Sequence, residues 1–359
     1  MKYKIFIVVG IACLVMASSC KTEPDVPKVK NIILLIGDGM GTAQIYAGMT
    51  VKKDKLNIEK FPVVGFQKTY SANSYVTDSG ASGTAIATGH KTKNGSIAVD
   101  TSGKPLKSIL EYAEDHGYVT GLVATSTITH ATPASFIAHN VNRGDYESIA
   151  SDFLKTDIEL IIGGGEDHFN NREDSLNLIK SFEKMGYSFV RDLSGIRNSS
   201  DKIICLVSKE ALPPMGERDE KFLPDATQIA VDFLNNRGDG FFLMVEGSQI
   251  DWAAHDNNTE GVVAEVLDFD DAVGEALEFA MKDKETLVIV TADHETGGMG
   301  INGGSILEGT VEAGYTTDGH TGVMVPVFAF GPGAGQFSGI YENTDLFFKM
   351  MEAYGFKPE

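Results

Sequence analysis

The stretch NIILLIGD, residues 31–38, decides the fold. After Asn31 it is an unbroken apolar run, and it ends at Gly37 and the carboxylate Asp38. An apolar run without alternation predicts a strand buried on both faces, as in a parallel sheet covered by helices. The same pattern recurs at residues 119–124, 158–162, 203–207, 241–245, 287–291 and 325–329.

Helical patterns lie between these strands, at residues 106–116, 226–235, 262–281 and 345–354. This alternation predicts an α/β fold: one large domain over residues 31–359, with a mostly parallel central sheet and helices on both faces. Residues 170–225 are less regular, and an inserted subdomain is an alternative for that stretch.

The first residues are typical of a targeting signal. A short basic start and an apolar run at 5–16 precede a small-residue stretch that ends at Cys20. We predict a lipoprotein-type signal over 1–19, lipidation of Cys20 and a polar tether over 20–30. The chain would then be exported to the cell envelope or periplasm and meet the membrane only through this lipid. An ordinary cleaved signal peptide is the alternative.

Charge and cysteine content restrict the function. The formal net charge is -20 in 359 residues, which argues against a nucleic-acid partner because such a partner requires a basic stripe. A phosphate site in such a chain needs local positive charge from bound metal or arginine. Besides the lipidated Cys20, Cys205 is the one cysteine that remains after removal of the signal, so we expect a buried core thiol and no internal disulfide.

Polar residues capable of binding metal follow several predicted strands. Asp38 follows the first strand, Glu246 ends the 241–245 run, and Asp293 with His294 follows the 287–291 run. In open α/β sheets the ligand crevice lies beyond the carboxyl ends of the strands. We therefore expect these side chains to meet at one edge of the sheet.

Further candidate ligands lie nearby in the sequence. In VEGSQIDWAAHDN, Asp251 and His255 are four residues apart and share one helix face, while His320 in TDGHTGV adds another imidazole. Imidazole with carboxylate suits zinc, whereas carboxylates with a hydroxyl suit magnesium. One isolated Asp-x-x-x-His pair is usually only solvated, but the whole set favours a metal site.

The segment VTDSGASGTAIATG carries the candidate nucleophile. Ser79 stands at the start of a small-residue helix, whose free amides and dipole favour an anion. A serine is a poor nucleophile unless a base or a metal activates it. A plain serine-capped helix start is the alternative, so this segment is weak support alone.

The segment ITHATPASFIAHNVNRGD offers a phosphate clamp. Thr132 precedes a proline at a predicted helix start, and its hydroxyl can bind a cation. Arg143 lies eleven residues later, about three helical turns on, and a guanidinium can hold two phosphate oxygens. For His139 we favour a structural role.

These blocks together resemble the alkaline phosphatase family. NIILLIGDGMG, VTDSGASGTAIATGHKTKNG, HATPASFIAH with the later arginine, VEGSQIDWAAH, TLVIVTADH and DGHTG occur in the family's order between residues 31 and 322. The resemblance implies phosphomonoester hydrolysis at alkaline pH through a phosphoserine on Ser79, with Arg143 as phosphate clamp, Asp78 positioning it, two zinc ions and one magnesium. It assigns one zinc to Asp251, His255 and His320, the other to Asp38, Asp293 and His294, and the magnesium to Asp38, Thr132 and Glu246.

Two positions depart from the best-known bacterial pattern. His130 stands where that pattern has Asp, and Trp252 stands where it has Lys, so the third metal site and phosphate release should differ. His130 is either a direct ligand of the third ion or lies behind its ligands; the sequence leaves both open. Residues 300–317 leave room for a small crown insertion or none, and the resemblance suggests a homodimer.

Other functions remain as alternatives. A phosphodiesterase or a sulfatase would keep the same metal frame, but Ser79 precedes Gly-Ala-Ser-Gly rather than the x-Pro-x-Arg of sulfatases, and diesterases often use Thr. A non-catalytic, metal-stabilised surface lipoprotein is the alternative from another class. It would not require nucleophile, clamp and ligands together. The expected small molecules are phosphomonoesters and inorganic phosphate.

Overall fold

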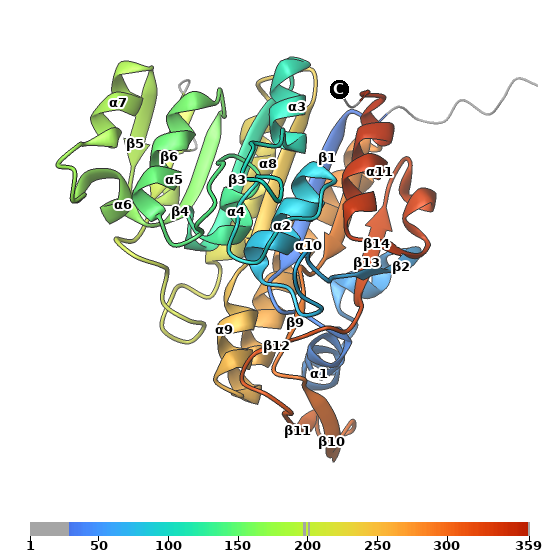
Figure 1. Ribbon diagram of the computed structural model, residues 1–359. Coiled ribbons are helices and arrows are strands. Elements are labelled where there is room, and N and C mark those ends of the chain that lie inside the picture. The colour runs from blue at the N-terminus through green and yellow to red at the C-terminus, as the bar shows by residue number, and fades with distance from the viewer. Residues whose placement is uncertain (1–28, 197–198, 200–201, 358–359) are drawn as a thin grey trace, which may run out of the picture.

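The computed structural model describes residues 29–196, 199 and 202–357. The predicted signal, Cys20 and the tether up to residue 28 lie outside these residues. Within them, one ten-stranded sheet runs through the molecule in the order β14-β2-β13-β8-β1-β7-β3-β4-β6-β5 (Figure 1). Its strands are β1 (Asn31–Gly37), β2 (Val63–Lys68), β3 (Val119–Thr127), β4 (Leu160–Gly164), β5 (Tyr187–Val190), β6 (Lys202–Leu206), β7 (Phe241–Gly247), β8 (Thr286–Thr291), β13 (Val325–Phe330) and β14 (Gly339–Glu342).

The sheet is mostly parallel, as predicted. β13 is the exception, because it pairs antiparallel with both β2 and β8. β1 lies between β7 and β8 and is buried along its whole length, which explains why its sequence lacks alternation.

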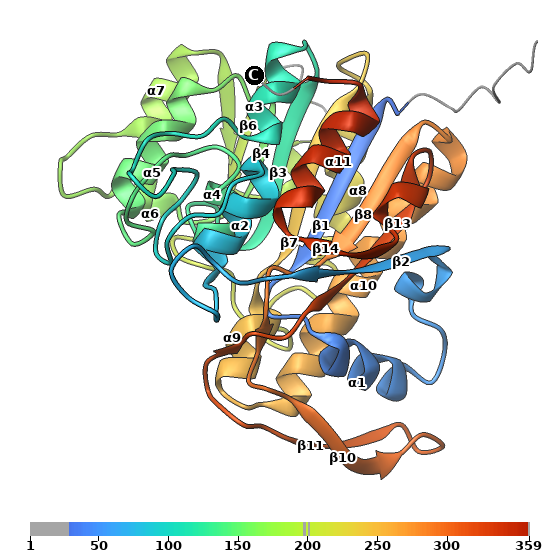
Figure 2. The same cartoon turned by 45° about the vertical axis from the view of Figure 1, so that its right-hand side comes forward.

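Helices cover both faces of the sheet (Figures 1 and 2). Alternate residues of β1 point to opposite faces: Ile32 and Leu34 enter one hydrophobic core, whereas Ile33 and Leu35 enter the other. The first core is covered by α2 (Ser79–Thr88), α3 (Ile109–Asp115), α5 (Tyr146–Asp152), α7 (Leu178–Lys184) and α11 (Thr344–Tyr354). The second is covered by α1 (Thr42–Lys52), α8 (Phe222–Asn235), α9 (Gln249–His255) and α10 (Thr259–Asp283). Two short helices, α4 (Ala131–Ala134) and α6 (Glu166–Asn170), lie in the connections after β3 and β4.

The irregular stretch 170–225 is not an inserted subdomain. It supplies β5 and β6 to the edge of the central sheet, with α7 packed before them. Its apolar runs are short because an edge strand buries less than a central one; Ser188, Phe189 and Val190 are only partly buried. The alternative of a separate subdomain is therefore wrong.

The region 300–317 contributes one hairpin, β10 (Gly300–Ser305) with β11 (Thr310–Gly314), which projects beyond α1 (Figure 2).

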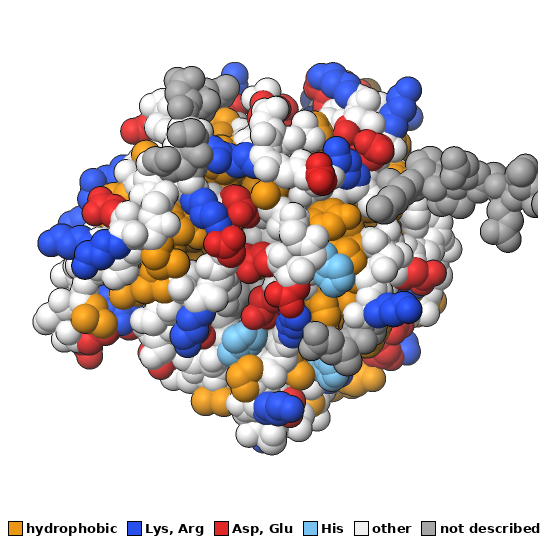
Figure 3. Space-filling model, turned by 90° about the horizontal axis from the view of Figure 1, so that it is seen from above, with side chains coloured by type: hydrophobic (Ala, Val, Ile, Leu, Met, Phe, Trp, Pro, Cys, Tyr) orange, Lys and Arg blue, Asp and Glu red, His pale blue; other side chains and the backbone are white. Residues whose placement is uncertain are grey.

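Cys205 is a free, buried thiol on β6, and burial raises its pKa to about 12. Among the described residues, no helix is long and apolar enough to cross a bilayer. The face seen in Figure 3 mixes Lys and Arg with Asp and Glu rather than showing one sign of charge.

Candidate active site

The carboxyl ends of three neighbouring strands bring the predicted ligands together. The pairing of β1 with β7 sets Ile36 beside Glu246, and the pairing of β1 with β8 sets Ile36 beside Thr291. Asp38 and Asp293 each follow two residues after these paired positions. The sheet register thus brings Asp38 close to carboxylates that are more than 200 residues away in sequence. For example, the Gly39 amide donates a hydrogen bond to Asp293 Oδ1, 254 residues further along the chain.

Asp38, Asp293 and His294 form one fully buried group. His294 Nε2 lies 3.4 Å from Asp38 Oδ1 and 3.2 Å from Asp293 Oδ2. Both oxygens of Asp38 and Oδ2 of Asp293 have no hydrogen-bond partner. Burial and the charge of Asp293 raise the pKa of Asp38 well above its usual value, and burial raises the pKa of Asp293 to about 6. Such buried, unpaired carboxylates are costly, and a bound cation would remove that cost.

Asp251, His255 and His320 form a second group beside the first. Asp251 Oδ1 lies 3.3 Å from His255 Nε2 and 3.5 Å from His320 Nε2, and the two Nε2 atoms are 3.2 Å apart. The other ring nitrogens are anchored: His255 Nδ1 contacts the Asp318 carbonyl, and His320 Nδ1 lies 2.8 Å from the Thr77 carbonyl. This arrangement turns both Nε2 atoms toward one point, as in metal-binding histidines whose second nitrogen is held by the protein.

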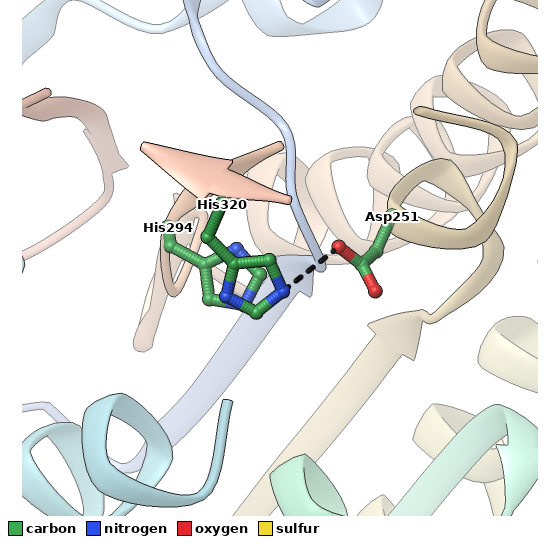
Figure 4. A group of neighbouring side chains, drawn as sticks. All are labelled: Asp251, His294 and His320. Carbon is green, nitrogen blue, oxygen red and sulfur yellow. Dashed lines mark ion pairs between the residues drawn. The ribbon is translucent and has the colours of Figure 1, made fainter. Parts of the chain in front are cut away.

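The ring of His294 connects the two groups. It stacks on the ring of His320, as Figure 4 shows beside Asp251. The two ring centroids are 3.6 Å apart. Asp251, His294 and His320 each offer a ligand atom within 4.8 Å of the others. Although burial alone would raise the pKa of Asp251, its hydrogen bond to His255 and the nearby imidazoles lower it. Asp251 in turn raises the pKa of His255 to about 9.

A third group surrounds Glu246. Oε1 of Glu246 and the hydroxyl of Thr132 are buried without a hydrogen-bond partner, while Glu246 Oε2 accepts bonds from Ser126 and Ser248. Burial raises the pKa of Glu246 to about 7. Asp38, His130 and Glu246 offer ligand atoms within 4.8 Å of one another. Carboxylates with a hydroxyl form the oxygen-rich environment that magnesium prefers.

Ser79 lies at the first position of α2 and faces these groups. Its Oγ is 3.2 Å from His294 Nε2, and the residue is 1% exposed. The helix cap is Asp78, whose Oδ1 accepts from the Ala81 amide at 2.9 Å, so the plain serine-cap alternative for Ser79 is wrong. Small residues are required in this helix, since a Cβ on Gly83 would lie 2.9 Å from Ser135 Oγ.

Arg143 reaches the same space, but not along a helix. The helical spacing considered between Thr132 and Arg143 is not observed: α4 ends at Ala134, and the chain reaches Arg143 through a loop. Arg143 Nη1 donates to Asp78 Oδ2 at 2.9 Å, and the Arg143 amide donates to the Gly95 carbonyl at 2.7 Å. The ion pair with Asp78 and the backbone bond to Gly95 thus fix the position of Arg143, although no helix connects it to Thr132.

The two unusual residues, His130 and Trp252, lie together. Their rings make an edge-to-face contact with centroids 5.9 Å apart, and His130 Nε2 lies 3.4 Å from Arg143 Nη2. Burial, followed by the charge of Arg143, lowers the pKa of His130 to about 4, so its ring is neutral at neutral pH. His139 instead contacts the Ala98 carbonyl and Glu111, in keeping with the structural role predicted for it.

Several residues around the site were not singled out from the sequence. Ser126 and Ser248 hold Glu246, and Thr296 donates to Asp251 and lies 3.3 Å from His294 Nδ1. Their signal in the sequence is weak, because a hydroxyl after a strand is common in any α/β protein.

The fold and site define a class: an α/β protein in which a buried serine at a helix start faces carboxylate and imidazole groups suited to divalent metals. The chain belongs to the alkaline phosphatase family, whose sequence model matches residues 29–313. It is 38% identical to alkaline phosphatase 4 of Bacillus subtilis, over 92% of this chain and 90% of that protein.

Solved structures agree with this membership. Alkaline phosphatase from the Antarctic bacterium TAB5 is 41% identical, with a TM-score of 0.89, over 93% of this chain and all of that chain (100%). A variant of that protein, with one histidine replaced by glutamate and Mg bound in a site named M3, is 40% identical with a TM-score of 0.88, over 93% of this chain and 100% of that one. The chain is therefore an enzyme of the alkaline phosphatase type.

Proposed function

We propose that this chain hydrolyses phosphate monoesters through a phosphoserine on Ser79, at a site for two zinc ions and one magnesium. The observation that carries the proposal is the 3.2 Å contact between Ser79 Oγ and His294 Nε2. It places a buried hydroxyl against an imidazole shared by two groups of candidate metal ligands.

The residues present fit these metals. Buried oxygens of Asp38, Thr132, Glu246 and Asp293 have no hydrogen-bond partner, which is costly unless a cation meets them. We assign one zinc to Asp251, His255 and His320, the other to Asp38, Asp293 and His294, and magnesium to Asp38, Thr132 and Glu246. When bound, these ions supply Lewis acidity and lower the pKa of the oxygens they contact.

The chain's own groups position the substrate. Arg143 is held by Asp78 and can bind two phosphate oxygens, and the N-terminus of α2, which begins at Ser79, would attract the same anion. Burial lowers the pKa of His294 well below its usual value, so this ring is neutral and cannot repel a cation.

The proposed reaction has two displacements. In the first, the Ser79 hydroxyl gives up its proton as its oxygen bonds to phosphorus, the bond from phosphorus to the ester oxygen breaks, and the leaving oxygen takes up a proton to become an alcohol. In the second, water attacks phosphoserine from the side the alcohol vacated, and inorganic phosphate and the free serine are released. Both in-line steps need the incoming and leaving oxygens on opposite sides of phosphorus, which a rigid Arg143 and α2 would enforce.

The test is hydrolysis of an aryl phosphate monoester, a diester and a sulfate ester at alkaline pH. Activity on the monoester should disappear with a chelator and return with zinc and magnesium. Ser79→Ala should abolish turnover and covalent phosphorylation, whereas Ser135→Ala, at a buried serine bonded to Ala131, should retain both. Near-normal turnover by Ser79→Ala contradicts the phosphoserine, and a preference for the diester or sulfate identifies the related alternatives. No activity on any ester favours a binding lipoprotein.

The setting of the enzyme is a separate proposal that rests on sequence. The signal-like residues 1–19 and Cys20 support export and lipid anchoring in the cell envelope. A Cys20→Ser variant should lose incorporation of labelled fatty acid and appear in the soluble fraction. If the parent chain incorporates no lipid, an ordinary signal peptide is the better explanation.

A homodimer is proposed with it. Tyr46, Tyr75, Val323 and Met324 are exposed large apolar side chains, a type of surface that often marks contact with another protein. Light scattering on the purified chain should give twice the monomer mass.

A further inference from the structure

Glu295 is a buried carboxylate that the proposed reaction does not use. It directly follows Asp293 and His294 and is 5% exposed. Unlike the candidate metal ligands, it has hydrogen-bond partners on both oxygens. Oε1 accepts from Gln44 Nε2 at 2.8 Å and from the Met299 amide at 3.0 Å, and Oε2 accepts from the Gly298 amide at 3.2 Å and from the Thr321 hydroxyl. With its lone pairs occupied, Glu295 is suited to hold neighbouring segments rather than a metal.

The donors come from three separate segments. Gln44 belongs to α1, Met299 and Gly298 belong to the turn after β9 (Glu295–Thr296), and Thr321 belongs to β12 (His320–Thr321). The fit is close, because a Cβ on Gly41, just before α1, would lie 2.4 Å from Glu295 Cγ. Glu295 therefore links β12 to α1 and to the turn after β9, and each of its two oxygens accepts two hydrogen bonds.

His320 depends on this connection. The chain between β11 and β13 is fully described and contains β12 as its one strand. β12 pairs only with β9, with His320 opposite Thr296 and Thr321 opposite Glu295. A two-residue ladder is weak alone. The Gly297 amide, which donates to the Gly319 carbonyl at 2.8 Å, and the Thr77 carbonyl beside His320 Nδ1 also hold this segment. The bond from the Thr321 hydroxyl to the buried Glu295 carboxylate adds a charge-assisted contact right next to His320.

The neighbouring Thr296 extends the same support. Its hydroxyl donates to Asp251 and lies 3.3 Å from His294 Nδ1, and its carbonyl accepts from Gln44 Nε2 at 2.8 Å. One short strand, β9, thus adjoins Asp251 from α9 and His320 from β12, besides His294, which directly precedes it.

We propose that Glu295 is a positioning residue for the zinc site of Asp251, His255 and His320, acting through the Thr321 hydroxyl on His320. The inference rests on the proposed function for the zinc assignment. It predicts that this zinc is weakened selectively when the Glu295–Thr321 contact is lost, because partners behind metal ligands typically contribute 10–100-fold in affinity.

The experiment measures zinc affinity and stoichiometry by competition with a chromophoric chelator, without substrate. Thr321→Val removes the hydroxyl while keeping shape and backbone pairing, and Glu295→Gln places an amide against the Gly298 amide. Both should lower the affinity for one of the two zinc ions by roughly 10–100-fold and leave the other unchanged. Thr321→Ser, which keeps the hydroxyl, should retain the parent's affinity.

A matched control separates positioning from general stability. Glu111 also accepts a backbone amide, that of Ser108 at 2.8 Å, but caps α3 away from the site. Glu111→Gln should lower the melting temperature of the chelated protein without changing zinc affinity. If Thr321→Val and Glu295→Gln also lower the melting temperature without changing zinc affinity, the role of Glu295 is only structural and the proposal is wrong. If Glu295→Gln fails to fold, the zinc affinity of Thr321→Val alone decides between the two.

The result is distinguishable from failure of the proposed function. A parent chain that binds two zinc ions but hydrolyses no ester contradicts the phosphatase reaction and still tests Glu295. A parent chain that binds no zinc overturns both proposals.

Discussion

Asp78→Ser separates two roles of one carboxylate. Asp78 Oδ1 caps α2 through the Ala81 amide, while Oδ2 accepts from Arg143 Nη1 and from the Gly95 amide, all at 2.9 Å. Serine is about as good a cap as aspartate, but its short side chain cannot reach Arg143. The variant should therefore keep the helix start and release the clamp.

The expected loss of phosphate affinity follows from the side-chain conformational freedom that Arg143 regains when Asp78 no longer holds it. Ordering a long side chain on binding costs about 0.5–1.5 kcal/mol, so the affinity for inorganic phosphate should fall roughly 2- to 10-fold. The free energy of unfolding should change by less than about 1 kcal/mol, whereas Asp78→Ala should lose about 1 kcal/mol more through the missing cap.

The assay is competitive inhibition of aryl phosphate hydrolysis by inorganic phosphate at saturating metal, with urea unfolding in parallel. Arg143→Ala provides the scale, because loss of a charge-assisted bond of about 1.5–3 kcal/mol should weaken phosphate binding more than Asp78→Ser does. A phosphate inhibition constant equal to or below that of the parent would refute the reasoning. It would mean that the Asp78 charge repels phosphate more than it orders Arg143.

Three further predictions concern other parts of the chain. Arg218→Met should lower the free energy of unfolding in urea by about 3–5 kcal/mol, because it leaves the buried carboxylates of Glu265 and Asp268 without a partner. These carboxylates lie 2.7 and 2.6 Å from the Arg218 guanidinium. A loss below about 1 kcal/mol would contradict this prediction. His130→Asp should raise the magnesium content of the purified enzyme and the magnesium dependence of its rate, since a carboxylate replaces an imidazole beside Asp38; unchanged metal content would argue against His130 adjoining the third ion. In a chain with the signal cysteines replaced by serine, Cys205 should not react with maleimide at pH 8, because burial raises its pKa to about 12 and keeps it protonated; labelling should appear only on unfolding.

The central strands could be predicted from sequence, but the edges could not. β1, β7 and β8 are buried along their whole length, so their apolar runs are continuous. β2, β5 and β14 are not among the predicted strands, because they are partly exposed and mix polar with apolar residues. The antiparallel direction of β13 depends on the path of the chain after the hairpin, and the composition of the strand carries no sign of it.

The site divides in the same way. Asp38, Glu246 and Asp293 could be placed because parallel strands end at one edge of a sheet, and Asp251 with His255 because helical spacing puts them on one face. No periodicity places Arg143 or His320, which lie on loops. Their positions depend on contacts such as that of His320 with the Thr77 carbonyl, 243 residues away in sequence. For these two, family resemblance was the source of the prediction.

These contacts change how Ser79 should be understood. Its own segment gives it a buried place at a helix start, but no carboxylate–histidine relay of the kind that activates a serine protease. The imidazole at 3.2 Å, His294, is neutral, its Nδ1 faces Thr296, and its Nε2 also lies 3.2–3.4 Å from Asp293 and Asp38. A ring surrounded in this way is better suited to hold a cation than to remove a proton. The reactivity of Ser79 would then depend on residues that come from the ends of β1 and β8, and β9, which follows β8, would be as necessary to the nucleophile as the helix that carries it.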